Sequence, residues 1–268
     1  MPLIKGKNGI IWNYDIEGEG KTLLFLHGWG VDKRVWRQQS KYFSKKYQVI
    51  TVDLPGHGQT SWEKMKLTDM CEDLSKILIR LCPGKITVVS SSLGGLFALK
   101  MYEAFPEKIE RLVMVGSMPK FSKSEDYPYG LDVAEMRKLS GQLDQSYPSI
   151  VDVFFRSLFT KHERNSRRFK WLQKFRQFDN KPIKHALMQY LDVLEEEDLR
   201  SILEMTKLPM QFINGTEDEI CKKEVLNYIR TVQPNARYDF FEQCGHFPFL
   251  SKPHEFNQVL ESFLEDTD

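Results

Sequence analysis

The sequence predicts an α/β protein with a mostly parallel, twisted sheet that is flanked by helices and carries a helical cap. Apolar, β-branched runs alternate with helical patterns in both halves of the chain, which is typical of strand–helix–strand units. Between these halves the strand pattern disappears and helical patterns replace it. A chain of 268 residues can bury a sizeable core. We therefore expect one core domain, residues 1–117 and 208–268, and a cap insertion at 118–207.

The first block of the core contains five strand-like segments and three helices. The nearly all-apolar run at 23–27 has the composition of a strand that is covered on both faces. Thr68 could cap a helix that places Met70, Leu74 and Ile77 on one stripe. We expect strands at 10–14, 23–27, 47–53, 86–91 and 111–117, and helices at 33–45, 68–80 and 93–104.

The same rhythm returns near the end of the chain, and the cap lies between the two blocks. We expect strands at 210–214 and 238–242 and helices at 222–232 and 254–264. We expect the cap after the sixth core strand, directly after the segment at 111–117, although the patterns mark only five strands before it. Its helical segments lie near 131–143, 147–160, 163–178 and 183–197.

Ser92 stands where the strand at 86–91 runs into the helix at 93–104 without a loop. This is the setting of a nucleophile elbow, a sharp turn that lifts a serine hydroxyl clear of the sheet. The usual motif is G-x-S-x-G, whereas this chain reads Ser90-x-Ser92-x-Gly94. The missing first glycine weakens the motif, and a serine-rich turn without chemistry is the alternative interpretation.

An apolar strand that ends in His27-Gly-Trp29-Gly30 is the second element. Such a turn can direct backbone N–H groups at a developing oxyanion, and losing one such donor costs about 3 kcal/mol of transition-state stabilisation. We predict that the oxyanion donors are the N–H groups of Trp29 and Leu93. A tight turn without chemistry is the alternative here.

The remaining two elements are an acid and an imidazole at the ends of late strands. Asp218 and His246 each follow a strand through a glycine-containing turn, so both belong at the carboxyl edge of the sheet, where such sheets place their ligands. The order Ser, Asp, His is the order used by this type of site. We therefore predict the catalytic triad Ser92, Asp218 and His246. Glu217 and Glu219 are competitors of Asp218.

The other chemistry-bearing residues carry structural predictions. His27 and His57 lie beside glycines at strand ends and are expected to be turn residues, or residues that support the site from behind, and not the catalytic base. The four cysteines lack metal or disulfide spacing, so we expect free thiols, no metal and no cofactor. A net charge of +1 gives no reason to expect nucleic acid. We see neither a secretory signal nor a membrane span, and we expect a cytoplasmic monomer.

These motifs resemble the α/β-hydrolase superfamily across nearly the whole chain, and so predict the α/β-hydrolase fold. More narrowly, the chain is similar to the pimeloyl-[acyl-carrier protein] methyl ester esterases of biotin synthesis. The similarity includes Ser92-Leu-Gly-Gly95, Gly245-His246, and the run from Gly116 to Pro128 at the entry to the cap. The resemblance implies that Trp29 also lines the acyl pocket and that Phe154 closes it from the cap.

Basic residues gather in the cap. Positions 156 to 184 hold ten Lys and Arg against two acidic residues, a net charge of +8. The resemblance implies that cap arginines dock an acidic carrier protein, here Arg156, Arg164, Arg167 and Arg168. A solvated helix face without a specific role is the alternative.

The sequence therefore predicts a serine hydrolase, of the carboxylesterase type, that acts on a small ester through an acyl-enzyme. Within this class, a pimeloyl-[acyl-carrier protein] methyl ester esterase, a broad carboxylesterase, an enol-lactonase and a C–C bond hydrolase remain open. Outside it, a non-catalytic small-ligand receptor is the alternative.

Overall fold

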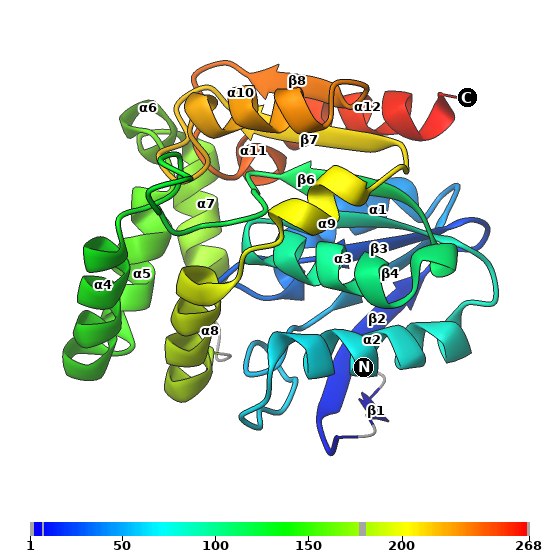
Figure 1. Ribbon diagram of the computed structural model, residues 1–268, viewed down its shortest axis with the longest axis horizontal. Helices are drawn as coiled ribbons and strands as arrows, with labels where there is room; N and C mark the ends of the chain where they lie inside the picture. The colour runs from blue at the N-terminus through cyan, green and yellow to red at the C-terminus, as the bar shows by residue number, and fades with distance from the viewer. Residues whose placement is uncertain (1–2, 7, 177–180, 267–268) are drawn as a thin grey trace.

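All eight strands of the protein join one sheet in the computed structural model, which describes residues 3–6, 8–176 and 181–266 (Figure 1). The strand order is β1-β2-β4-β3-β5-β6-β7-β8. The strands from β4 onward along this order pair in parallel, whereas β2 pairs antiparallel with both β1 and β4. Their bounds are β1 Leu3–Lys5, β2 Ile11–Glu17, β3 Thr22–Leu26, β4 Gln48–Val52, β5 Ile86–Ser91, β6 Ile109–Val115, β7 Met210–Gly215 and β8 Arg237–Phe241.

Helices cover both faces of this sheet because its central strands are buried on both sides. Strands β3 and β5 are buried along their whole length. Helices α1 (Arg37–Phe43) and α12 (Pro253–Glu265) lie on one face and contact each other there. The short helix η1 (Lys33–Trp36) directly precedes α1. On the other face are α2 (Leu67–Leu81), α3 (Leu93–Ala104), α9 (Arg200–Met205) and α10 (Lys223–Val232) (Figure 1). The predicted α/β class and the mostly parallel sheet are confirmed.

Helices α4, α5, α7 and α8 gather beside one end of the sheet, on the left of Figure 1. They follow β6 and precede α9 and β7, at the carboxyl ends of the parallel strands, so they stand next to the loops that carry Ser92, Asp218 and His246. The division into a core and a cap domain at 118–207 stays a prediction. The helices of this segment are α4 Val133–Ser146, α5 Ser149–Ser157, α6 Lys161–Arg164, α7 Arg167–Arg176 and α8 Lys184–Glu196.

Three local expectations were wrong. Helix α2 begins at Leu67, so Thr68 lies inside it instead of capping it, and the N-cap residue is Lys66. The single helix expected at 163–178 is divided into α6 and α7, and the end of that range lies outside the described residues. Strand β1 was missed because three residues are too short to show a pattern. With β1 included, the strand before the cap is the sixth.

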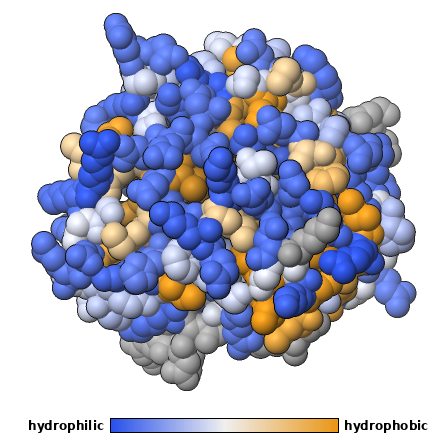
Figure 2. Space-filling model, turned by 60° about the horizontal axis from the view of Figure 1, so that its bottom comes forward, coloured by the Kyte–Doolittle hydropathy of each residue, from blue (hydrophilic) through white to orange (hydrophobic). Residues whose placement is uncertain are grey.

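The cysteines and the surface have the features expected from the composition of the chain. All four cysteines are buried and free. Within the described ranges, no helix is long and apolar enough to cross a membrane. On the face shown in Figure 2, hydrophilic residues predominate and apolar ones form several smaller areas. The short helices η2 (Pro106–Lys108) and α11 (Pro248–Ser251) complete the fold.

Candidate active site

Ser92 occupies the turn between β5 and α3 in a strained backbone conformation. Its φ of 53° and ψ of −121° lie where L-residues rarely occur, as expected for a serine held at a sharp strand-to-helix turn. Gly94 permits the turn, because a Cβ at this position would come within 2.8 Å of the backbone oxygens of Leu26 and His27. The Ser117 hydroxyl donates to the Ser92 carbonyl at 2.7 Å and holds the turn against the segment that follows β6.

Ser90, which replaces the usual first glycine of the motif, is buried, and its hydroxyl has a hydrogen-bond acceptor. Its side chain is fully buried, and its hydroxyl donates to the Val113 carbonyl of β6 at 3.0 Å. A serine at this position therefore stabilises the β5–β6 pair, and the departure from the motif leaves the turn at Ser92 intact.

Asp218 and His246 form a buried pair. The Nδ1 atom of His246 lies 2.9 and 3.0 Å from the two carboxylate oxygens of Asp218, and both residues are almost inaccessible to solvent. Asp218 Oδ1 also accepts from the N–H groups of Ile220 and Cys221, which fixes the carboxylate. Because a carboxylate only accepts, the neutral tautomer that fits this contact carries its hydrogen on Nδ1, which leaves the Nε2 lone pair to take up a proton.

Ser92 and His246 line the same cavity, which has a volume of about 140 Å³. The structure thus brings the three predicted catalytic residues to one edge of the sheet. The described residues show no hydrogen bond between the Ser92 hydroxyl and the imidazole. The rest of the wall is almost wholly apolar and comes from α4, α5, α8 and the loops: Trp29, Phe121, Leu131, Glu135, Met136, Leu139, Phe154, Leu158, Leu191, Leu194, Ile220 and Phe247.

Of the two predicted oxyanion donors, Trp29 lines this cavity and Leu93 directly follows Ser92 in the chain. Leu93 is the first residue of α3, so its N–H has no acceptor in the helix itself. The N–H of Trp29 makes no hydrogen bond to another described residue. Both groups are therefore available to a bound oxygen at the edge where Ser92 lies, and their assignment stays a proposal.

The side chains of Trp29 and Phe154 meet within the cavity wall. Their ring centroids are 4.9 Å apart in an edge-to-face contact, which links the loop after β3 to α5. The indole N–H of Trp29 donates to the Leu187 carbonyl of α8 at 3.0 Å. Trp29 thus touches two of the helices that follow β6. The part of the wall that Met136 and Leu139 of α4 contribute was not predicted, because an amphipathic stripe does not tell which surface it covers.

His27 and His57 are buried turn residues, as expected. Nε2 of His27 accepts from the Leu54 N–H, and Nε2 of His57 accepts from the Gly30 N–H. Burial lowers the pKa of His27 to about 4 and that of His57 to about 3. Both rings are therefore neutral near pH 7 and hold the loop after β3 against the loop after β4.

We expect the free energy of unfolding to fall by about 2–3 kcal/mol between pH 7 and pH 5. The unfolded histidines take up protons below pH 6.5, whereas the folded pKa values of His27 and His57 lie near 4 and 3. Their stabilisation is thus complete above pH 6.5 and is lost as the pH falls. Burial raises the pKa of Asp53 to about 6, so the folded protein takes up one proton there below pH 6, which stabilises it. The unfolded chain takes up two protons at the histidines, so the net stability still falls.

Urea unfolding at pH 7, 6 and 5 measures this dependence. The control is His254→Gln, in which a solvent-exposed histidine of α12 is removed while His27 and His57 stay buried, so the fall in stability should persist. Equal or greater stability at pH 5 would contradict the neutral, buried state of the two histidines.

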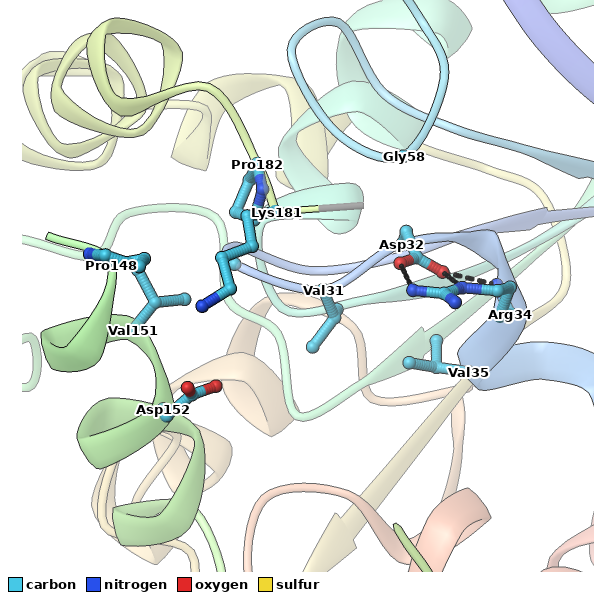
Figure 3. A pocket seen from close by; sticks show the side chains of 11 residues that line it. Val31, Asp32, Arg34, Val35, Gly58, Pro148, Val151, Asp152, Lys181 and Pro182 are labelled. Carbon is cyan, nitrogen blue, oxygen red and sulfur yellow. Dashed lines mark hydrogen bonds and ion pairs between the residues drawn. The ribbon is translucent and has the colours of Figure 1, made fainter. Parts of the chain in front are cut away.

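A second cavity, of about 40 Å³, lies beside η1 and contains none of the predicted catalytic residues (Figure 3). Asp32 and Arg34 face each other there in an ion pair of 2.7 Å. The side chain of Lys181 extends toward Val151 and Asp152 on α5. This cavity is smaller than the one at Ser92 and holds none of the predicted catalytic residues, so the apolar cavity at Ser92 is the candidate active site.

The four cap arginines differ in their contacts. Arg164 donates to the Phe159 carbonyl at 2.9 Å, and Arg168 donates to the Leu250 carbonyl at 2.8 Å, so each uses part of its guanidinium within the protein. Arg156 and Arg167 are exposed to solvent. Of the four, Arg156 and Arg167 are therefore the better placed to meet a partner.

Comparison with known proteins places this geometry in a family. A family model described as alpha/beta hydrolase fold matches residues 21–253. The chain is 30% identical to a pimeloyl-[acyl-carrier protein] methyl ester esterase of Nitrosomonas europaea, over 91% of this chain and 96% of that protein.

Two solved structures share the fold. An esterase from Exiguobacterium antarcticum superposes with a TM-score of 0.89 at 24% identity, over 98% of this chain and 99% of the other. The enol-lactonase from Burkholderia xenovorans gives a TM-score of 0.87 at 18% identity, over 99% of this chain and 100% of the other. At these sequence identities the two structures show a shared fold and give no evidence about function.

Proposed function

Since the chain belongs to the alpha/beta hydrolase fold family, we propose that it is a carboxylic ester hydrolase that works through an acyl-enzyme. Ser92 is the nucleophile, His246 the general base, and Asp218 the residue that orients the imidazole. The observation that carries this proposal is the cavity that Ser92 and His246 share, with Asp218 bound to the far side of the imidazole ring.

The reaction takes two steps. Nε2 of His246 takes the proton of the Ser92 hydroxyl while the oxygen attacks the ester carbonyl, and the N–H groups of Trp29 and Leu93 stabilise the oxyanion. The imidazolium returns the proton to the leaving alkoxide, so an alcohol departs and an acyl-serine remains. Water then attacks this ester with the help of the same base, which releases the acid and restores Ser92.

The substrate that fits best is an ester with an aliphatic acyl chain, presented on an acidic carrier. The apolar cavity wall suits a hydrocarbon chain, with Trp29 and Phe154 against it. The name of the relative from Nitrosomonas europaea specifies a pimeloyl chain on acyl-carrier protein. We therefore propose pimeloyl-[acyl-carrier protein] methyl ester as the substrate, with methanol as the leaving alcohol, and Arg156 and Arg167 as the main docking residues.

The double variant Arg156→Glu, Arg167→Glu is expected to raise KM for a methyl-pimeloyl carrier protein about tenfold, because reversed charges repel an acidic partner. Its kcat, and its hydrolysis of short p-nitrophenyl esters, should stay near the wild-type values, since neither arginine lines the cavity. Steady-state kinetics with both substrates measures this difference. Arg80→Glu on α2 is the control, because it reverses an exposed charge on a core helix.

Two outcomes would contradict the carrier proposal. One is an unchanged KM for the carrier-bound ester in the double variant. The other is a wild-type kcat/KM that is no higher for the carrier-bound ester than for the p-nitrophenyl esters. The second result would favour a broad carboxylesterase, while hydrolysis of neither ester, with an unreactive Ser92, would favour the small-ligand receptor.

A further inference from the structure

The Glu163 carboxylate lies between the helices that follow β6 and the loop that carries His246. Glu163 belongs to α6 and is only 8% exposed. It completes a capping box with Thr160, in which Glu163 Oε2 accepts from the Thr160 N–H at 2.6 Å and Thr160 Oγ1 accepts from the Glu163 N–H at 3.1 Å. A capping box needs no further partner. This carboxylate nevertheless has two more.

Both additional partners precede His246 directly in the chain. The Gly245 N–H donates to Glu163 Oε2 at 3.1 Å, and the Cys244 thiol donates to Glu163 Oε1 at 3.2 Å. Burial and the adjacent carboxylate raise the pKa of the Cys244 thiol, so it stays protonated and keeps its hydrogen for this bond. Each carboxylate oxygen of Glu163 thus accepts a hydrogen bond from one of the two residues that precede His246.

The backbone of His246 is held by the same segment. Its N–H donates at 2.9 Å to the carbonyl of Leu158, which directly follows α5. Gly245 allows this approach, because a Cβ there would lie 2.5 Å from the same carbonyl oxygen. Residues 158–163 therefore hold the loop at 244–246 from one side.

The other side of this loop is held by the turn that carries Asp218. The Cys244 carbonyl accepts from the Glu217 N–H at 2.9 Å, and the Gln243 N–H donates to the Thr216 hydroxyl at 3.1 Å. The imidazole thus has two supports. Asp218 fixes the ring, and Glu163 with Leu158 fixes the backbone from which the ring projects.

We infer that Glu163 is a positioning residue for the base His246, through which the segment after β6 sets the place of the imidazole relative to Ser92. This inference rests on the proposed function. Glu163 does not line the cavity, so it acts on the rate of the chemical step and not on substrate affinity. A displacement of about 1 Å can cost on the order of 100-fold in rate.

The test compares kcat, KM and melting temperature of Glu163→Ala, Glu163→Gln and Thr160→Ala with a p-nitrophenyl ester as substrate. Glu163→Ala leaves the Gly245 N–H and the Cys244 thiol without their acceptor, so kcat should fall about 10- to 100-fold at nearly constant KM. Glu163→Gln keeps an oxygen for the Thr160 and Gly245 N–H groups and should recover kcat to within about threefold of wild type.

Thr160→Ala is the matched control, because it removes the hydroxyl that accepts from the Glu163 N–H in the capping box but leaves the bonds from Gly245 and Cys244 to the Glu163 carboxylate. It should lower the melting temperature while kcat stays near wild type. Equal kcat in Glu163→Ala and Thr160→Ala, or no recovery in Glu163→Gln, would overturn the positioning role. If Glu163→Ala does not fold, Glu163→Asp, whose shorter side chain cannot span both partners, takes its place in the same comparison.

Failure of this inference can be told apart from failure of the proposed function. If Ser92→Ala is inactive and Glu163→Ala behaves like Thr160→Ala, only the positioning role is wrong. If Ser92→Ala is fully active, the assignments of Ser92 as nucleophile and His246 as base are both wrong, and the inference about Glu163 fails with them.

Discussion

Replacing Ser92 with alanine should abolish ester hydrolysis and leave the fold intact. Only the hydroxyl is lost, at a position where alanine adopts the same backbone conformation with similar strain. Without a nucleophile, no acyl-enzyme forms, and kcat should fall on the order of 10⁴- to 10⁶-fold. Steady-state hydrolysis of a p-nitrophenyl ester measures the loss, and thermal unfolding shows that the variant is folded.

Ser91→Ala provides the matched control, one residue earlier in the chain. The Ser91 hydroxyl is fully buried and makes no hydrogen bond to any described residue. Its removal should therefore leave kcat and the melting temperature close to the wild-type values. A Ser92→Ala enzyme with wild-type turnover, or a Ser91→Ala enzyme with the larger loss, would refute the assignment of the nucleophile.

Asp218→Asn should lower kcat on the order of 10⁴-fold while the protein remains folded. The amide oxygen can still accept from the Ile220 and Cys221 N–H groups, so the turn after β7 keeps its shape. The amide NH₂ then faces Nδ1 of His246 and forces the ring hydrogen onto Nε2. In that tautomer the imidazole cannot accept the serine proton. The rate of p-nitrophenyl ester hydrolysis measures the effect.

Glu217→Gln and Glu219→Gln test the alternative acids. Both side chains point to solvent, and neither accepts from His246 among the described residues. Each variant should therefore keep kcat close to that of the wild type. A large loss in either one, together with an active Asp218→Asn enzyme, would move the orienting role away from Asp218.

The fold could be predicted from the sequence because its core strands and helices follow one another with clear patterns. The helix expected at 93–104 has those bounds in the structure, and most of the expected core strands lie within one or two residues of their observed positions. The match to the alpha/beta hydrolase family model confirms the family, and the relatives confirm the expectation of a hydrolase.

The segment between β6 and β7 was harder to predict in detail. The division between α6 and α7 falls at residues 165–166, where the chain carries no proline or glycine to mark it. Strand ends could be assigned because apolar runs give way to turns that contain glycine, serine or proline, but helix ends in this segment depend on tertiary contacts. The limits of the cap, 118–207, stay a prediction for the same reason.

The site divides in a similar way. Ser92, Asp218 and His246 could be chosen from chain order and strand ends, since parallel strands bring their carboxyl ends to one edge. The role inferred for Glu163 could not. Thr160-x-x-Glu163 is readable as a capping box, but the contact with Cys244 and Gly245 spans about 80 residues and depends on the packing of α6 against the loop after β8.

Labelling with a fluorophosphonate, followed by peptide mapping, tests the central claim most directly. This reagent forms a stable bond only with a serine whose oxygen is activated by a base. We predict rapid, stoichiometric modification of Ser92 in the wild-type protein, much slower modification in Asp218→Asn, and none in Ser92→Ala. An unmodified wild-type protein, or a label on another serine, would contradict the triad and with it the proposed hydrolase.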